Sequence, residues 1–243
     1  MLRTETATWP EMKTALAVHP PAVLPFGAHE QHGPHCPLNT DTVLSAGLAE
    51  GLAQDLDALL LPAMPYGETW NNEGFAGTLS LSVETVSAIL LDLGRGLKRS
   101  GAGALIVVNG HFGNRAPLAA AAEGLESETG LPVLLLDYPG LEEVAARVCQ
   151  SSPAGPSFYH ADELETSLVL HLQPGTVRME LAAPEYPQFP PDFGTRPIML
   201  DSFCQSGVFG DPRPASAEKG ERILAGLLQE SLRVAREFLA ARV

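Results

Sequence analysis

Short apolar runs alternate along the chain with longer segments in which apolar residues recur at helical spacing. We predict buried strands at four runs, which cover residues 22–26, 58–62, 104–108 and 133–137. Each run ends at glycine, proline or polar residues, as strands typically do. Helical spacing predicts helices over 42–56, 83–97, 115–128 and 216–241. This alternation favours the α/β class, with a mainly parallel sheet covered by helices on both faces.

Residues 184–214 break this alternation, because they are rich in proline and glycine and have little periodicity. A segment of that length without regular elements is unusual in a compact domain and is often a functional or interface loop. We therefore expect ordered loop and edge structure there. We also expect the loop over 66–75 to line a pocket, since it follows the second predicted strand.

Composition narrows the class of protein. The 243 residues, 45% of them hydrophobic, fit one globular domain over 1–243. The formal charge of −14 disfavours nucleic acid as a partner. We expect no membrane segment, because no apolar stretch reaches about 18 residues, and the N-terminus does not resemble a signal peptide. Three cysteines without a CxxC pair favour a reducing, cytoplasmic location.

The segment 27–41 is the strongest candidate for chemistry. It follows the first predicted strand, and it contains three of the seven histidines with two carboxylates, interrupted by glycine and proline. Ligands of α/β folds bind at the carboxyl ends of strands. The five side chains are His29, Glu30, His32, His35 and Asp41.

Two further segments supply ligand-type residues. His111 lies between glycines at the end of the third strand, and therefore points toward the same end of the sheet. His160 precedes a predicted helix that Asp162 can cap. Glu163 and Glu165 fall in the first turns of that helix and point to different sides, so that one can enter the site while the other remains a helix-terminal charge.

Imidazoles with carboxylates, and no required thiolate, suit Zn²⁺, Mn²⁺ or Fe²⁺. Two metal ions need a bridging carboxylate, for which Asp41 is the natural candidate. Such a pair polarises a carbonyl group and supplies hydroxide near neutral pH, and a histidine outside the ligand set can shuttle protons. His29 and His35 remain open as supporting residues, and Cys36 is expected to be a small apolar filler.

As a set and in this order, five motifs resemble those of the creatininase (creatinine amidohydrolase) family. They are Gly27-Ala-His-Glu-Gln-His-Gly-Pro-His35 with Asp41, Phe75-Ala-Gly-Thr-Leu-Ser-Leu81, Asn109-Gly-His-Phe-Gly-Asn114, His160-Ala-Asp-Glu-Leu-Glu-Thr-Ser167 and Gly207-Val-Phe-Gly-Asp-Pro212.

The resemblance implies a three-layer α/β/α fold, two divalent metal ions per subunit, a homo-oligomer that is often a hexamer, and hydrolysis of a non-peptide or unusual C–N amide bond in a small molecule. It implies that one metal ion is bound by Glu30, Asp41 and His111, and the other by His32, Asp41 and a glutamate. It also implies that His160 is the catalytic residue, which we expect to act as the proton shuttle.

Two departures from the family pattern bear on the metal ligands and on the substrate. Creatininases have a glutamate where this chain has Gly113. The resemblance to relatives with a glycine there implies that the missing ligand is Glu165, and we then expect Glu163 to orient a histidine ligand or to face water. They also have tryptophans near the catalytic histidine, whereas Trp9 and Trp70 lie elsewhere in this chain. We therefore expect a cyclic or formylated amide other than creatinine as the substrate. The alternatives are a metallopeptidase that trims a modified precursor peptide, and a catalytically silent metal-binding subunit.

Overall fold

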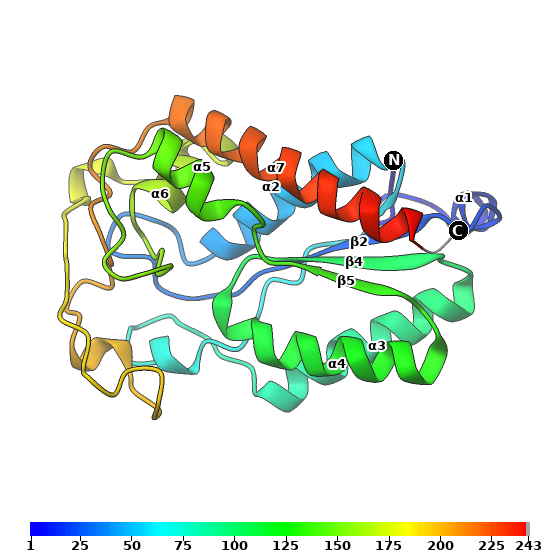
Figure 1. Cartoon of the computed structure of the whole chain (residues 1–243), viewed down its shortest axis with the longest axis horizontal. Helices are drawn as coiled ribbons and strands as arrows, with labels where there is room; N and C mark the ends of the chain where they lie inside the picture. The colour runs from blue at the N-terminus through cyan, green and yellow to red at the C-terminus, as the bar shows by residue number, and fades with distance from the viewer. Residues whose placement is uncertain (242–243) are drawn as a thin grey trace.

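A parallel five-stranded sheet forms the centre of the molecule in the computed structural model, which describes residues 1–241 (Figure 1). The strand order is β1-β3-β2-β4-β5, and every pairing is parallel. The strands are β1 (Leu2–Arg3), β2 (Pro21–Phe26), β3 (Leu59–Leu60), β4 (Ala104–Asn109) and β5 (Val133–Leu136). The predicted class, a mainly parallel sheet between helices, is confirmed.

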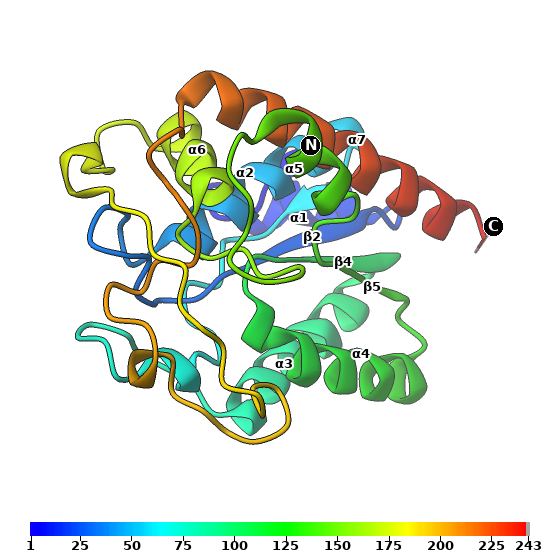
Figure 2. The same cartoon turned by 60° about the vertical axis from the view of Figure 1, so that its left-hand side comes forward.

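Helices cover both faces of the sheet, so that the fold has three layers (Figures 1 and 2). α3 and α4 lie on one face, and α2, α5, α6 and α7 lie on the other. Within residues 1–241, none of the helices is long and apolar enough to cross a membrane. The helices are α1 (Trp9–Leu16), α2 (Thr40–Asp55), α3 (Val83–Ser100), α4 (Arg115–Thr129), α5 (Leu141–Val148), α6 (Glu163–Leu172) and α7 (Ala217–Ala240).

The buried strands supply two separate hydrophobic cores. In β4, Ile106 and Val108 pack against the face of α2 and α7, while Leu105 and Val107 pack against α3 and α4. Successive side chains of a strand point to opposite faces. A strand covered on both faces therefore has a continuous apolar sequence, which is why β2 and β4 were predictable from their apolar runs.

Several elements differ from the sequence predictions. β3 has only two residues, and β1, α1 and α5 were not predicted. β1 has two residues, which is too short for a hydrophobic pattern. α1 has no buried residue, so its apolar positions do not form the apolar face by which a packed helix is recognised. α2 begins at Thr40, two residues earlier than predicted, which places Asp41 in its first turn.

Residues 184–214 form loop structure that covers the carboxyl end of the sheet. Their helical content is one 3₁₀ turn, η4 (Leu200–Ser202). Isolated bridges join Glu185 to Gly210 and His160 to Phe209. Phe189, Phe193 and Phe203 form a cluster with Phe158 and Phe209. This aromatic packing explains how a segment with so little regular structure is ordered.

Candidate metal centre

The candidate site lies at the carboxyl ends of β2 and β4, where loops carry polar side chains over the edge of the sheet. Glu30 and His32 come from the loop after β2, and Asp41 comes from the first turn of α2. His111 follows β4 directly, and Glu165 lies in the first turn of α6. All five are buried, so their polar atoms must find partners inside the protein.

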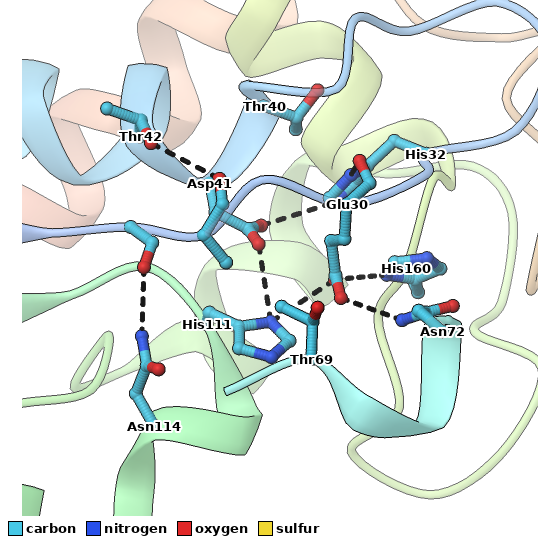
Figure 3. A network of polar contacts seen from close by, with 12 residues as sticks. Glu30, His32, Thr40, Asp41, Thr42, Thr69, Asn72, His111, Asn114 and His160 are labelled. Atoms are coloured by element: carbon cyan, nitrogen blue, oxygen red, sulfur yellow. Dashed lines mark hydrogen bonds and ion pairs between the residues drawn. The ribbon is translucent and has the colours of Figure 1, made fainter. Parts of the chain in front are cut away.

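One group of potential ligand atoms comprises Glu30, Asp41 and His111 (Figure 3). The Nδ1 atom of His111 lies 3.2 Å from Glu30 Oε1 and 3.2 Å from Asp41 Oδ2. Its other nitrogen, Nε2, lies 2.8 Å from the backbone carbonyl oxygen of Glu68, to which it donates a hydrogen bond. That bond leaves the lone pair on Nδ1 directed at the carboxylates, which is how a metal-binding histidine is held.

A second group comprises His32, Asp41 and Glu165. His32 Nε2 lies 3.1 Å from Asp41 Oδ1 and 3.6 Å from Glu165 Oε2. Its Nδ1 atom lies 3.2 Å from the backbone carbonyl oxygen of Glu30, which keeps the proton on Nδ1 and the lone pair on Nε2. The two oxygens of Asp41 therefore face different histidines, as a carboxylate that bridges two cations would.

The unpaired atoms of the site test whether divalent cations fit. Among residues 1–241, Glu30 Oε1, His32 Nε2 and Asp41 Oδ2 are buried without a hydrogen-bond partner. Leaving such groups unpaired costs about 1–3 kcal/mol each, and more when the group is charged. Because the three atoms belong to the two ligand groups and are carboxylate oxygens or an imidazole nitrogen, these residues fit divalent cations such as Zn²⁺ or Mn²⁺.

The pKa values show how strongly the carboxylates attract positive charge. Burial by itself lowers the pKa of His32, but Asp41 and Glu165 outweigh it and raise this pKa to about 10. Burial also opposes protonation of His111, whose pKa the carboxylates of Glu30 and Asp41 nevertheless raise well above its ordinary value. A cation that binds here would displace these protons.

His160 lies beside both ligand groups. Its ring centroid is 4.4 Å from that of His32, and its Nδ1 atom is 3.7 Å from Glu30 Oε1. Burial and the charge of His32 lower the pKa of His160 to about 4. A backbone hydrogen bond from Phe209 to the His160 carbonyl oxygen ties the histidine to the 184–214 loop.

The two glutamates of α6 have different surroundings. Asp162 caps the helix by accepting hydrogen bonds from the backbone amides of Leu164 and Glu165. Glu165 faces the candidate centre, whereas Glu163 accepts hydrogen bonds from Ser151 and pairs with Lys219. We expected Glu163 to be a helix-terminal charge in water or the partner of a histidine. That expectation is wrong, because α7 covers this side of α6 and buries the carboxylate.

The remaining candidates lie outside the two groups. His35 Nε2 lies 2.8 Å from Thr166 Oγ1, and burial lowers the pKa of this histidine to about 4. His29 packs against the ring of Tyr66. Burial raises the pKa of the Cys36 thiol to about 12, and within residues 1–241 this cysteine belongs to none of the groups of potential ligand atoms.

Three residues of the site were not named individually by the sequence reasoning. Asn72 donates a 2.8 Å hydrogen bond to Glu30 Oε2 (Figure 3), and Gln31 contacts His160. Tyr138, directly beyond β5, lines the same pocket, and its hydroxyl has no hydrogen-bond partner in the part of the chain that the structure describes. Its backbone is left-handed, with φ of 49°. Asn72 belongs to the 66–75 loop, which we expected to line a pocket and which does so. The position of Gln31 between Glu30 and His32 was the available signal for that residue, whereas Tyr138 had no such signal.

Gly113 lies where the backbone of Glu68 closely approaches the ring of His111. A Cβ atom at this position would overlap the backbone oxygen of Glu68 and the ring of His111. Glycine therefore lets Glu68 reach His111 and fix its orientation. The carboxylate that faces His32 from outside the 27–41 loop is Glu165, whose Oε2 atom lies 3.6 Å from His32 Nε2.

Comparisons with known proteins agree with this geometry. A model of the Creatininase family, described as creatinine amidohydrolase, matches residues 5–235. The mycofactocin precursor peptide peptidase of Mycolicibacterium smegmatis is 34% identical over 86% of this chain and 81% of its own. The creatinine amidohydrolase of Pseudomonas putida is 29% identical over 91% of each chain. The solved structure of a mutant creatininase of the Zn-Zn type superposes with a TM-score of 0.88, at 28% identity over 97% of both chains.

Proposed function

The chain belongs to the creatininase family of metal-dependent amidohydrolases, and we propose that it hydrolyses an unusual C–N amide bond at a centre for two divalent cations. The observation that supports this most directly is the pair of ligand groups that share Asp41. In this proposal Glu30, Asp41 and His111 bind one cation, and His32, Asp41 and Glu165 bind the other. Two such cations polarise an amide carbonyl group and lower the pKa of a bound water.

The protein residues orient and enclose the reacting amide. The backbone carbonyl oxygens of Glu68 and Glu30 fix the rings of His111 and His32. His160 is the catalytic residue of this proposal, because its Nδ1 atom faces the carboxylates. Phe158 and Leu200 line the pocket around these groups and exclude water, which strengthens the electrostatic interactions inside it.

For the substrate we favour the amide bond of a peptide over creatinine. Two observations support this choice. The relative named as a precursor peptide peptidase is 34% identical, against 29% for the creatinine amidohydrolase. Trp9 and Trp70 do not line the pocket, where Phe158 and Tyr159 flank His160. The second candidate is a small cyclic or formylated amide, which the same two-cation centre would also hydrolyse.

The identity of the cations, the assembly and the location extend this proposal. The oxygen and imidazole ligands favour Zn²⁺ or Mn²⁺, with Fe²⁺ as a third candidate. We propose a homo-oligomer, since Trp9 is 76% exposed and Leu93 is 42% exposed on the same apolar patch. We propose a cytoplasmic location, supported by the three free thiols. Elemental analysis, light scattering and cell fractionation test these three statements.

A chelator experiment tests the function. The purified protein is stripped of metal, reloaded with Zn²⁺ or Mn²⁺, and incubated with short peptides, cyclic amides, formamides and creatinine. We expect mass spectrometry to detect cleavage of a peptide amide only in the reloaded protein. Full activity in a demonstrably metal-free sample would contradict the proposal. Absence of turnover across the panel in fully loaded protein would favour the silent metal-binding subunit instead.

A further inference from the structure

A hydrogen-bond network fixes which way the side-chain amide of Gln31 points. The backbone N–H of Gly33 lies 2.9 Å from Gln31 Oε1, and a backbone amide is always a donor. The oxygen of Gln31 must therefore face Gly33. Its nitrogen, Nε2, then faces away from Gly33 with two N–H groups to donate.

Asn72 fixes the same orientation independently. Its Nδ2 atom donates to Glu30 Oε2, and an ionised carboxylate has acceptors only. The Oδ1 atom of Asn72 therefore points the other way, and it accepts a 2.9 Å hydrogen bond from Gln31 Nε2. If the Gln31 amide were rotated by 180°, its oxygen would face the Asn72 oxygen and its N–H groups would face the N–H of Gly33. Neither contact could then be a hydrogen bond.

This orientation determines the tautomer of His160. The second N–H of Gln31 Nε2 points at His160 Nε2, 2.7 Å away. That ring nitrogen must accept the bond through its lone pair, so it carries no proton. A neutral imidazole has one proton, which is then on Nδ1. Nδ1 is the atom that faces Glu30 at 3.7 Å and the candidate metal centre (Figure 3).

We propose that Gln31 is a positioning residue that holds His160 as a neutral Nδ1–H imidazole, so that His160 donates a hydrogen bond to the carbonyl oxygen of the substrate and does not shuttle protons. This inference rests on the proposed function, because it assumes that an amide is hydrolysed at this centre. A neutral ring that lost its only proton would become an imidazolate. A ring that gained a proton at Nε2 would oppose the N–H of Gln31. Both steps of a shuttle are therefore disfavoured.

The same tautomer disfavours His160 as a metal ligand. Glu30, His32 and His160 also form a group whose ligand atoms lie close together. A ligand needs a free lone pair on the nitrogen that faces the cation, but here Nδ1 carries the proton. His111 and His32 differ in this respect, since backbone carbonyl oxygens hold their protons on the nitrogens that face away from the centre.

A glycine of the 184–214 loop supports the network. Gly207 has φ of +77°, and a Cβ atom there would overlap the side-chain amide of Gln31. Two residues later, Phe209 packs against the ring of His160 and donates its backbone N–H to the carbonyl oxygen of this histidine. The Gly207-Val-Phe209 segment therefore confines both partners of the Gln31–His160 contact.

Nitrogen-15 NMR of histidine-labelled, zinc-loaded protein tests the tautomer directly. His160→Asn identifies the His160 signals by their loss. We expect a protonated Nδ1 and an unprotonated Nε2 in the wild-type protein. In Gln31→Glu the new carboxylate accepts where the amide donated, so Nε2 should become protonated. Gln54→Glu adds the same charge at an exposed position of α2 and should change nothing. A wild-type ring protonated at Nε2 would overturn the proposal, whether or not an amide substrate has been found.

Turnover of the loaded variants tests the role. His160→Ala should lower turnover by about 10²–10³-fold, the usual effect of removing one donor to a developing oxyanion. His160→Asn places an amide N–H near the position of Nδ1 but cannot transfer protons. It should be about tenfold more active than the alanine variant, as expected for a partly restored donor. Equal activities of the two variants would indicate that His160 transfers protons. Loss of bound metal in both variants would indicate that His160 is a metal ligand.

Gln31 itself is tested by Gln31→Met, which keeps the length of the side chain but removes its hydrogen bonds. We expect kcat to fall by about 10–100-fold, the range for partners that orient catalytic groups, with KM and metal content little changed. Circular dichroism and metal analysis confirm that each variant is folded and loaded. An unchanged kcat in a folded, loaded variant would exclude the positioning role.

Discussion

At the scale of single residues, the candidate centre depends on which carboxylate of α6 faces it. Glu165 Oε2 lies 3.6 Å from His32 Nε2, whereas Glu163 pairs with Lys219 on the side of the helix that α7 covers. Two positions apart on a helix differ by roughly 200° in direction. The two glutamates therefore have separate functions, one at the candidate centre and one in the packing of two helices.

Replacing each glutamate by glutamine separates these functions. Glu165→Gln keeps the shape but removes the charge that attracts a divalent cation, so we expect it to lose about one metal equivalent per subunit, as measured by elemental analysis. Glu163→Gln should retain both metal ions. Its thermal stability should fall, since the mutation leaves the mostly buried Lys219 ammonium without its charged partner. The reverse pattern of metal loss would exchange the two roles.

At the scale of elements, close packing of α6 and α7 positions Glu165. Gly220 of α7 lies against the backbone carbonyl oxygen of Ser167 in α6, and a Cβ atom there would overlap that oxygen. Backbones approach this closely only where no side chain separates them. The first turn of α6 is buried as a result, and it holds Glu165 near His32.

Gly220→Ala should destabilise the protein by about 1–3 kcal/mol, the range for overpacking a buried contact. Alanine is the better helix former by about 1 kcal/mol, so propensity alone predicts the opposite sign. Gly96→Ala in α3 is the matched control, because a Cβ atom there meets only the end of the Arg99 side chain at 3.8 Å. The free energy of unfolding of the control variant should be unchanged or higher than that of the wild type. Chemical denaturation of both variants measures the difference, and a stabilised Gly220→Ala would show that the two helices can move apart at little cost.

At the scale of the whole molecule, the fold gathers Glu30, Asp41 and Glu165 in a buried site of a chain whose formal charge is −14. Cations that bind the folded state and not the unfolded chain stabilise the fold by mass action, by about 4 kcal/mol at a thousand times the dissociation constant.

Removal of the metal ions with a chelator should therefore lower the melting temperature by about 5–15 °C in a chain of this size. Scanning calorimetry before chelation, after it and after reloading measures the change. His111→Ala should melt between the loaded and the chelated wild type and respond less than the wild type to added Zn²⁺, because one ligand group is incomplete while the other keeps its three ligands. A melting temperature that is insensitive to chelation would contradict a cation site in the folded state.

The shape of the pocket gives a prediction about the substrate. A small flat ring needs close aromatic enclosure, and here Phe158 and Tyr159 flank His160 in place of tryptophans. We expect the zinc-loaded protein to hydrolyse creatinine far more slowly than dedicated enzymes do, which turn over at about 1–10³ per second. A colorimetric creatinine assay measures this rate, with the peptide substrate as the positive control. Turnover within that range would reverse the preference for a peptide.

The class of fold and most of the converging residues were predictable from local sequence pattern. The apolar runs of β2 and β4 predict strands buried on both faces, and Glu30, His32 and His111 follow their carboxyl ends directly. This inference succeeds because strand burial and strand ends are local properties of the chain. The family resemblance added Glu165, which local pattern alone left equivalent to Glu163.

The contacts between distant segments depend on tertiary packing and could not be predicted from local pattern. Nothing local to Glu163 indicates that α7 will cover it, and nothing local to Tyr138 places it beside the centre. The orientation of His160 likewise depends on Gln31, 129 positions earlier in the chain, and on the loop that contains Gly207. A hydrogen bond determines which nitrogen of His160 carries the proton only when Gln31 lies against the ring. The packing of the loops over the sheet brings these two side chains together.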